Sequence, residues 1–412
     1  MDAARPHNGI NQTLQQQLNL SLILRMLWKE GTCSRATLSR LSGLQRPTIS
    51  NIIRDCIQCG LVVEQGLMEG EKGRRSIGIA INGDRYRVIA VKVSRRVCSV
   101  MLMGLSGECY EKECFPITQQ EDATTTISNL RTHIAQIIDR NPQCQVLAVG
   151  MTVPGPFKRE NEEIIFVTNL VGWEGVHLMK ELKKLGDIPV FIGNDANAAA
   201  SACLWKSGNQ PSAADLVYVI AGYGVGSGIV SHGRLLTGSL GIAGEIGHTS
   251  ICYDGPKCEC GNRGCLECYC SALVLERNLQ SRLNAGESSV LEVVSGHLTW
   301  EAIQAAIRGG DEMATREFVQ VCRYLAVGIV NLINQCNPSK VIIGDLLTKL
   351  APALLLNTVR DHVRSSVRPS IWENLTIELD TMEEDPILLG AGLLAVEQVL
   401  ERPAAFIPDM PR

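Results

Sequence analysis

The sequence predicts an α/β protein that carries a winged helix-turn-helix module in front of its body. Two observations support this fold class. The start of the chain reads as three short helices followed by two strands, and the rest of the 412 residues alternates strands with helices in two successive halves. We therefore expect a winged helix-turn-helix domain at residues 1–82, a two-lobed body at 83–400 and a C-terminal tail at 401–412.

Composition fits a globular protein, with 45% hydrophobic and 20% charged residues. No apolar run approaches the roughly 18 residues that a transmembrane helix needs, so we expect no membrane insertion. The polar start lacks the apolar stretch of a secretory signal, which predicts a cytoplasmic protein. In a reducing compartment, a cluster among the 16 cysteines is more often a metal site than a set of disulfides.

Charge is distributed unevenly along the chain. Residues 1–86 contain eleven Lys or Arg and seven Asp or Glu, a balance of +4, whereas the whole chain carries −4, which leaves −8 for the remainder. A basic front and an acidic body favour a module that binds a polyanion.

Helix signals organise the front module. Between residues 18 and 30, Leu20, Ile23, Leu24 and Leu27 recur at helical spacing. Ser34 is a suitable N-cap for a short second helix, and a third begins near "QRPTIS" with a proline in its first turn, where the missing N–H costs nothing. The order of helix, short helix, turn and helix is typical of a helix-turn-helix.

Residues 61–81 read as a strand, a charged glycine-rich turn and a second strand, which predicts a β-hairpin wing. The start of the third helix is where base edges would be read, and cations at the wing tip can reach phosphates or a narrow minor groove of double-stranded operator DNA. The residues expected to bind DNA are Gln45, Arg46, Thr48, Ser50, Asn51, Lys72, Arg74 and Arg75. The alternative is a helical module that docks a protein.

The body shows matching strand and helix signals in order. They predict a hairpin at 87–107, a buried strand at 146–156, a strand and helix at 190–205, two strands around glycines at 216–230, a helix and strand at 325–345, and a closing helix at 387–400. Such a duplicated α/β arrangement places the ligand cleft between its halves, at strand ends.

A cysteine-rich stretch, "HTSICYDGPKCECGNRGCLEC", occupies residues 248–268. His248, Cys258, Cys260 and Cys265 offer one imidazole and three thiolates, which suit one tetrahedral structural Zn²⁺ per chain in a knuckle at 248–265. Glycines within it allow the positive φ values that such a knuckle needs. The alternative is a group of buried apolar cysteines. We expect Cys252, Cys268 and Cys270 to be bystanders.

Six motifs carry a family resemblance: "VPGP", "GNDANAAA", "GYGVGSGIV", "GEIGH", "CECGNRGCLE" and "NPSKVIIGD". Their order and spacing over roughly residues 86–400 resemble the ROK family, which contains sugar kinases and sugar-responsive repressors on an actin-like ATPase fold. The front module resembles that of the repressor branch, which includes xylose-, N-acetylglucosamine- and glucose-responsive (Mlc-type) regulators. The family's kinases lack this module.

The resemblance implies a set of sugar contacts. Asn194 and Asp195 match the pair that binds sugar hydroxyls, and in kinases this aspartate is the base for the attacking hydroxyl. Glu245, His248 and Glu267 match further sugar contacts. Carboxylates and amides can bond several hydroxyls of one ring, which an apolar pocket cannot do. The knuckle would then hold His248 and Glu267 beside the sugar.

Departures from the family fall on the nucleotide side. The D-x-G-G-T phosphate loop is replaced by "KVSRR" at residues 92–96, with Lys92 for the acid and Ser94 and Arg95 for the glycines. Tyr223 stands in the second phosphate loop, and Asp345 replaces a glycine of the adenosine loop. Side chains fill the space that phosphates need, and no carboxylate remains there to bind Mg²⁺. We therefore expect a protein that is not an enzyme.

We therefore expect a sugar-responsive transcriptional regulator, a repressor of carbohydrate uptake or catabolism genes, whose effector is a small sugar or sugar phosphate. Fixed spacing of operator half-sites, together with the resemblance, implies a homodimer or homotetramer. Two alternatives stand beside this hypothesis: an active sugar kinase with an extra domain, and a regulator controlled mainly by a sugar-transport protein.

Overall fold

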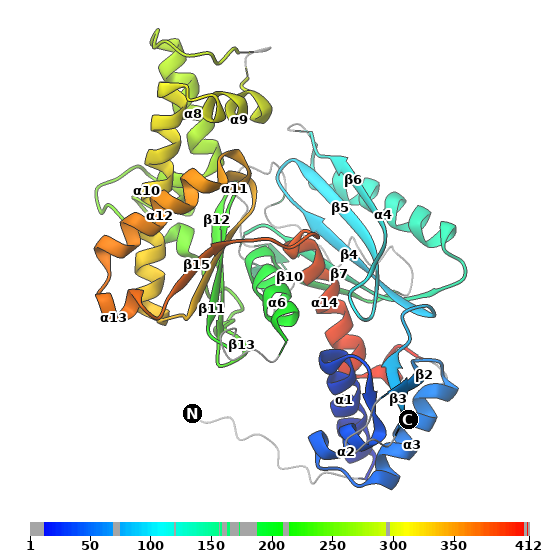
Figure 1. Cartoon of the computed structure of the whole chain (residues 1–412). Coiled ribbons are helices and arrows are strands. Elements are labelled where there is room, and N and C mark those ends of the chain that lie inside the picture. Colours follow the sequence, from blue (N-terminus) through cyan, green and yellow to red (C-terminus); the bar gives the residue numbers. More distant parts are fainter. Residues whose placement is uncertain are drawn as a thin grey trace, which may run out of the picture.

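The computed structural model describes residues 12–68, 75–118, 121–155, 157–158, 163–164, 173, 188–208, 214–293, 297–407 and 410. Within them, a small front module sits beside one lobe of a larger body built on two sheets (Figure 1). The predicted fold class is confirmed.

The front module contains the predicted helices and hairpin. Its elements are α1 (Gln12–Glu30), β1 (Cys33–Ser34), α2 (Arg35–Ser42), α3 (Arg46–Gln58), β2 (Val62–Met68) and β3 (Ser76–Ile81), with the strands in the order β1-β3-β2. Ser34 caps α2 by accepting from the Thr37 N–H, and Pro47 lies in the first turn of α3, as the sequence predicts. Helix α1 begins six residues before the predicted start.

The body repeats one sheet topology. The first sheet contains β4 (Tyr86–Val93), β5 (Val97–Gly104), β6 (Cys109–Pro116), β7 (Gln145–Val153) and β10 (Val190–Asn194). The second contains β11 (Leu216–Ala221), β12 (Val225–Ser231), β13 (Arg234–Leu235), β14 (Lys340–Gly344) and β15 (Thr376–Leu379). The orders are β10-β7-β4-β5-β6 and β13-β12-β11-β14-β15. In chain order, the first three strands of each sheet pair antiparallel, and the last two strands are added in parallel beside the first strand. The same pattern in both sheets confirms the duplicated α/β architecture.

Helices and short elements complete the body. They are α4 (Ala123–Arg140), β8 (Phe157–Lys158), β9 (Glu163–Ile164), α6 (Asp195–Ser207), η4 (Ile246–His248), α7 (Glu267–Cys270), α8 (Ala272–Asn284), α9 (Trp300–Arg308), α10 (Glu312–Cys336), α11 (Leu346–Leu350), α12 (Pro352–Ser366), α13 (Pro369–Trp372), α14 (Pro386–Glu401) and η5 (Pro403–Ala405). Helices α6 and α14 lie between the two sheets (Figure 1).

Close packing of α14 depends on small residues. A Cβ at Gly390 would lie 2.0 Å from the Ala198 carbonyl oxygen of α6, and a Cβ at Gly150 of β7 would lie 1.8 Å from the Ala391 oxygen. Glycine at both positions therefore lets α14 pack directly on the backbone of the helix and strand beside it.

The other end of α14 joins the core of the front module. Leu24 and Leu27 of α1 belong to the same buried cluster as Val399 and Leu400, and Arg25 lies 3.4 Å from the Glu401 carboxylate. The connection from β3 to β4 spans only residues 82–85. The front module is thus packed against the body as well as tethered to it. The domain limits of the sequence hypothesis stay a prediction.

Candidate functional site

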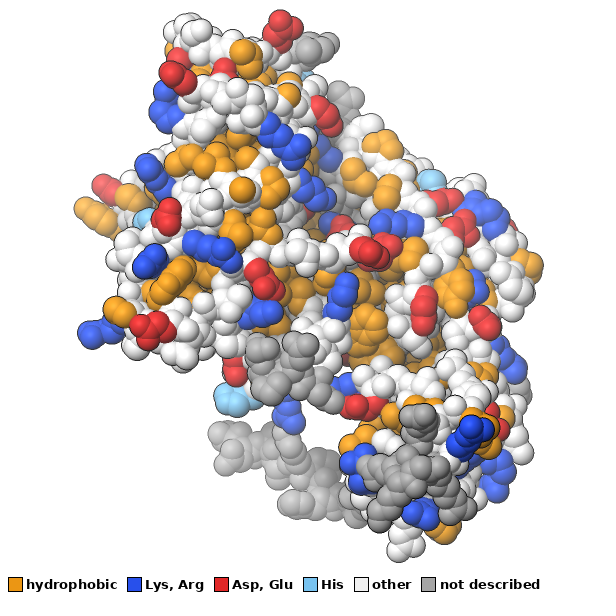
Figure 2. Space-filling model, viewed as in Figure 1, with side chains coloured by type: hydrophobic (Ala, Val, Ile, Leu, Met, Phe, Trp, Pro, Cys, Tyr) orange, Lys and Arg blue, Asp and Glu red, His pale blue; other side chains and the backbone are white. Residues whose placement is uncertain are grey.

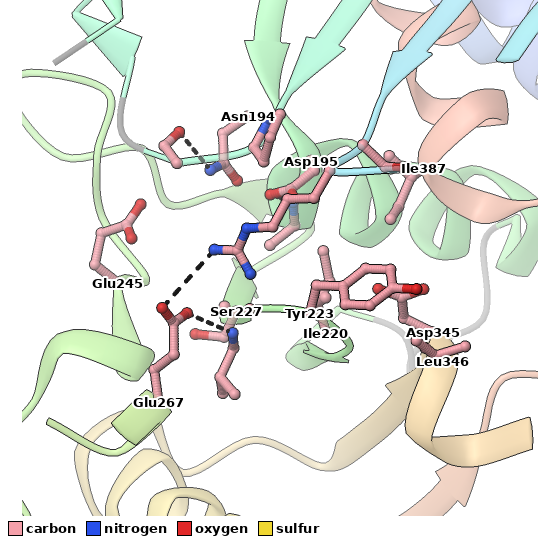
Figure 3. Close-up of a pocket in the computed structure, with 18 of the residues that line it drawn as sticks. Asn194, Asp195, Ile220, Tyr223, Ser227, Glu245, Glu267, Asp345, Leu346 and Ile387 are labelled. Carbon is pink, nitrogen blue, oxygen red and sulfur yellow. Dashed lines mark hydrogen bonds and ion pairs between the residues drawn. The ribbon is translucent and has the colours of Figure 1, made fainter. Parts of the chain in front are cut away.

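A cavity of about 150 Å³ lies between the lobes, where several strands end (Figure 3). Its walls come from the β4–β5 turn, the β10–α6 junction, the β11–β12 turn, α7 and the β14–α11 junction. In open α/β sheets this crevice is the usual ligand position. Pockets for drug-sized molecules have roughly 300 Å³ or more, so this cavity is a small one.

Asn194 and Asp195 lie where β10 passes into α6. The Asn194 side chain accepts from the Asn197 N–H at 3.0 Å and so caps the helix, while the Asp195 carboxylate accepts from the Ala196 N–H at 2.7 Å. Burial raises the pKa of Asp195 to about 6. Helix capping by Asn194, and the contact of Asp195 with the Ala196 N–H, hold both side chains at the cavity.

Glu245, His248 and Glu267 line the same cavity from the second lobe. Burial, with the nearby charges of Asp195 and Glu267, raises the pKa of Glu245 to about 7. Glu267 accepts from the Val225 N–H at 2.9 Å, across from Asp195 (Figure 3). The structure thus brings all five sequence-predicted sugar residues to one cavity. Their role in binding sugar stays a prediction.

The departures from the kinase pattern form the opposite wall. The Lys92 ammonium lies 2.6 Å from the Asp385 carboxylate at the N-terminus of α14. Burial alone would lower the pKa of Lys92, but the charges of Asp345 and Asp385 outweigh burial and raise that pKa. A charged lysine therefore stands at the position of the family's acid. Sequence reasoning missed Asp385, although an aspartate before a proline and an apolar run is a helix-start signal.

Asp345 and Tyr223 also fill space. Asp345 has φ +78°, and its carboxylate lies against Gly222, where a Cβ would be 2.0 Å from the carboxylate oxygen. The Tyr223 ring meets Trp300 edge-on at 5.9 Å. Arg96 lies 5.0 Å from the centre of the Tyr223 ring. Both loop substitutions therefore have packing partners.

The predicted metal ligands converge. Among the described residues, the ligand atoms of His248, Cys258, Cys260 and Cys265 all lie within 4.8 Å of one another. The Cys260 and Cys265 sulfurs are 3.7 Å apart, as are the Cys258 sulfur and His248 Nδ1. A tetrahedral zinc with Zn–S bonds of roughly 2.3 Å separates two sulfurs by about 3.8 Å, so the donor set fits that ion.

The knuckle is tied to the cavity wall. The Leu266 N–H donates to the Thr249 carbonyl at 3.0 Å, and α7 begins at Glu267, two residues after the Cys265 ligand. Gly264 has φ +64°, and a Cβ there would collide with the Cys252 carbonyl. These backbone contacts join the segment after η4 to the start of α7, where Glu267 lies.

Of the expected bystander cysteines, none belongs to the converging group. Cys252 is exposed and donates to Asp254, and Cys270 is buried and donates to the Leu266 carbonyl. Cys268 is partly buried.

The exposed face of α3 carries most of the predicted base-reading residues. Gln45, Arg46, Ser50 and Asn51 are exposed and Thr48 is half-buried. Arg54 shares this face with a 61% exposed side chain, and sequence reasoning missed it although it follows Ser50 at helical spacing. Basic side chains lie at several places on the surface of the module (Figure 2).

The wing and a groove beside α3 also belong to this part of the module. Arg75 is exposed beside β3, whereas Lys72 and Arg74 lie outside the described residues. Thr48 and Asn51 also line a groove that α3 shares with α1 and with residues 401–405. That side of α3 therefore faces both solvent and the end of α14.

No helix in the described part of the chain is both long and apolar enough to cross a membrane.

Comparison with known proteins gives relatives over nearly the whole chain. The xylose repressor of Caldicellulosiruptor bescii is 29% identical over 403 residues, covering 95% of this chain and 99% of the repressor. A solved ROK family transcriptional regulator, described as a homolog of the Escherichia coli Mlc protein, matches with a TM-score of 0.78 and 27% identity, covering 94% of this chain and 97% of its own.

A ROK family glucokinase from Streptomyces griseus, solved with glucose and AMPPNP, shares the fold of the body. Its TM-score is 0.64 at 24% identity, covering 75% of this chain and 99% of its own. The model of the ROK family matches residues 88–398. That match spans both lobes, the cavity and the cysteine knuckle, and on it the chain belongs to the ROK family.

Proposed function

We propose that this protein is a sugar-responsive transcriptional repressor of carbohydrate uptake or catabolism genes. One observation carries the proposal: a helix-turn-helix module is packed onto a ROK body whose sugar side is lined by hydrogen-bonding groups and whose nucleotide side is filled by side chains. The xylose repressor and the solved ROK transcriptional regulator, both matched over almost their full length, support it.

We further propose that the body does not transfer phosphoryl groups. Phosphoryl transfer needs phosphates and Mg²⁺ held in line with the acceptor. Here Lys92 is paired with Asp385, and Arg95 and Asp345 project into the cavity where those groups would need space. A lysine ammonium repels Mg²⁺ instead of binding it. Asp195 then serves as a sugar contact rather than as a base.

The knuckle is proposed to hold one structural Zn²⁺ through His248, Cys258, Cys260 and Cys265. Three thiolates and an imidazole leave no open position on a tetrahedral ion, which is typical of a structural site. Bound zinc would fix the η4–α7 corner and with it Glu245 and Glu267.

An operator with two half-sites requires two reading modules at fixed spacing, so we propose a homodimer or homotetramer that acts on double-stranded DNA in the cytoplasm. Sugar binding would change the spacing of the modules and release the operator.

Operator DNA selected from a random pool provides the test, together with a thermal-shift screen of free and phosphorylated sugars. A saturating ligand at a hundred times its Kd stabilises the fold by roughly 2.7 kcal/mol. We expect one sugar both to raise the melting temperature and to release the operator in a gel shift. Operator binding without any sugar response would support control by a sugar-transport protein, and absence of DNA binding would refute the proposal.

A further inference from the structure

The turn between β4 and β5 connects the two lobes through its arginines. Arg95 reaches across the cleft to within 3.8 Å of the Glu267 carboxylate on α7. Arg96 lies 3.3 Å from Glu276 of α8 and stacks over Tyr223. The turn belongs to the first sheet, and its three partners belong to the second lobe.

The second lobe accommodates the Arg95 guanidinium closely. A Cβ at Gly224 would lie 2.9 Å from Nη2 of Arg95 and 2.9 Å from the Glu267 carboxylate. The glycine in the β11–β12 turn therefore makes room for a protein cation. The side chains of Arg95 and Glu267 are only 9% and 13% exposed, so their attraction is weakly screened by water.

The pairing uses a group that the ligand would need. Glu267 lines the cavity together with Asn194 and Asp195, and the Arg95 side chain enters that cavity. A separation of 3.8 Å is longer than a hydrogen bond, so a sugar hydroxyl at hydrogen-bond distance can replace this contact. Arg95 lines the cavity beside Glu267, so its side chain takes up space that a sugar ring bound to this carboxylate would need.

We propose that Arg95 is an internal competitor of the effector: it pairs with Glu267 in the sugar-free protein, holds the lobes in the DNA-binding arrangement, and is displaced when sugar binds. This inference rests on the proposed function. It assigns a role to the arginine that occupies the former phosphate loop.

A route from this switch to the reading module is present in the fold. Lys92, three residues before Arg95, pairs with Asp385 at the start of α14, and α14 ends at Glu401 beside Arg25 of α1. A rearrangement of the lobes would therefore move a rigid helix that contacts the module.

The test is Arg95→Gln, which keeps length and polarity but removes the charge. We expect affinity for the sugar found in the screen to rise about tenfold and operator affinity to fall by a similar factor, since both measure one equilibrium. Arg95→Lys, which keeps the charge, should lie between Arg95→Gln and wild type. Arg140→Gln is the matched control, because it breaks a more exposed ion pair of α4, at 2.6 Å from Glu111, outside the cavity.

Competition predicts that Arg95→Gln raises sugar affinity and lowers operator affinity, whereas structural damage would lower both. A purely structural role for Arg95 would weaken sugar and operator binding together and lower the melting temperature, and that result would overturn the inference, as would unchanged affinities. If wild type binds the operator but no sugar, the proposed sugar response itself fails. If wild type binds sugar and Arg95→Gln binds it more weakly, only the competition fails.

Discussion

At the scale of single residues, the cavity concentrates carboxyl groups in a buried space. Asp195 lines the cavity opposite Glu245 and Glu267 (Figure 3), and burial is the first cause of the raised pKa of both Asp195 and Glu245. A carboxyl group whose pKa lies near neutral pH can donate a hydrogen bond when protonated and accept one when ionised. Both roles suit the recognition of hydroxyl groups.

Glu245→Gln tests this environment through the pH dependence of stability. The pKa of Glu245 is raised in the folded state to about 7, so its protonated form stabilises the fold below the unfolded pKa, and this contribution is lost as pH rises through 7. We expect the variant to exceed wild type in unfolding free energy at pH 8 by on the order of 1–3 kcal/mol, with the difference vanishing toward pH 5.

Urea denaturation of both proteins at several pH values would measure this difference. A constant difference across the range would show that Glu245 is not protonated on folding.

At the scale of elements, the knuckle acts as a clip between η4 and α7. Its predicted ligands come from both sides of the loop, His248 from η4 and Cys265 from two residues before α7. Backbone hydrogen bonds from the Ile251 N–H to the Gly264 carbonyl and from the Leu266 N–H to the Thr249 carbonyl close the loop. Metal binding can supply much of the stability of such a short loop.

Purified protein should contain about one zinc per chain, and Cys260→Ser should lose it. Without the bound metal, Glu267 and His248 would no longer be held in position, so sugar affinity should fall. We expect a loss of roughly 10- to 100-fold, the range typical of substitutions that disturb the groups around a metal. Cys252→Ser is the matched control, an exposed cysteine in the same loop but outside the ligand group. Elemental analysis measures the zinc content, and titration with sugar measures the affinity. A native protein that contains no metal and still binds sugar would refute the proposed role of zinc.

Helix α3 and the wing allow a second test at this scale. If Arg46 meets a guanine edge, Arg46→Ala should weaken binding mainly to the selected operator, by about 1–3 kcal/mol. Arg74→Ala and Arg75→Ala, if they contact phosphates, should weaken binding on all sequences and lower the slope of log K against log salt by about one each. A loss greatest on A·T-rich flanks would instead place them in the minor groove.

Gel shifts on operator and scrambled DNA at several salt concentrations separate these cases. Arg323→Ala, at an exposed position on α10 of the body, is the control and should leave DNA affinity unchanged. Unchanged affinity in every module variant would favour the protein-docking alternative.

At the scale of the whole molecule, the body retains the two-lobed ROK architecture but joins its lobes through side chains. Lys92, Arg95 and Arg96 each pair with a carboxylate outside the first sheet. If the proposed loss of kinase activity is right, these pairs occupy the space that a nucleotide would need.

We therefore expect no sugar-dependent release of ADP above background when the protein is mixed with Mg²⁺, ATP and its effector. Positioning of phosphates and metal supplies nearly all catalysis of phosphoryl transfer, and we propose that this protein lacks both. A coupled assay would measure the rate. Turnover that disappears in Asp195→Asn would show an active kinase instead.

The sequence by itself determined the local features. Hydrophobic periodicity and capping residues placed α3, α6 and the strands of both lobes, because these signals act between neighbours in the chain. The spacing of His248, Cys258, Cys260 and Cys265 indicated the metal group for the same reason, since a short loop can bring all four together. Ordered motifs with preserved spacing identified the family.

Only the tertiary structure decided what the substituted residues contact. The sequence of residues 92–96 predicts the loss of a phosphate loop, but their partners Glu267, Glu276 and Asp385 lie about 170 to 290 positions away in the chain and follow no local pattern. The same holds for α14, whose ends meet the cavity and α1. Long-range pairing depends on how two sheets and their helices pack, and packing is a property of the assembled fold rather than of any segment.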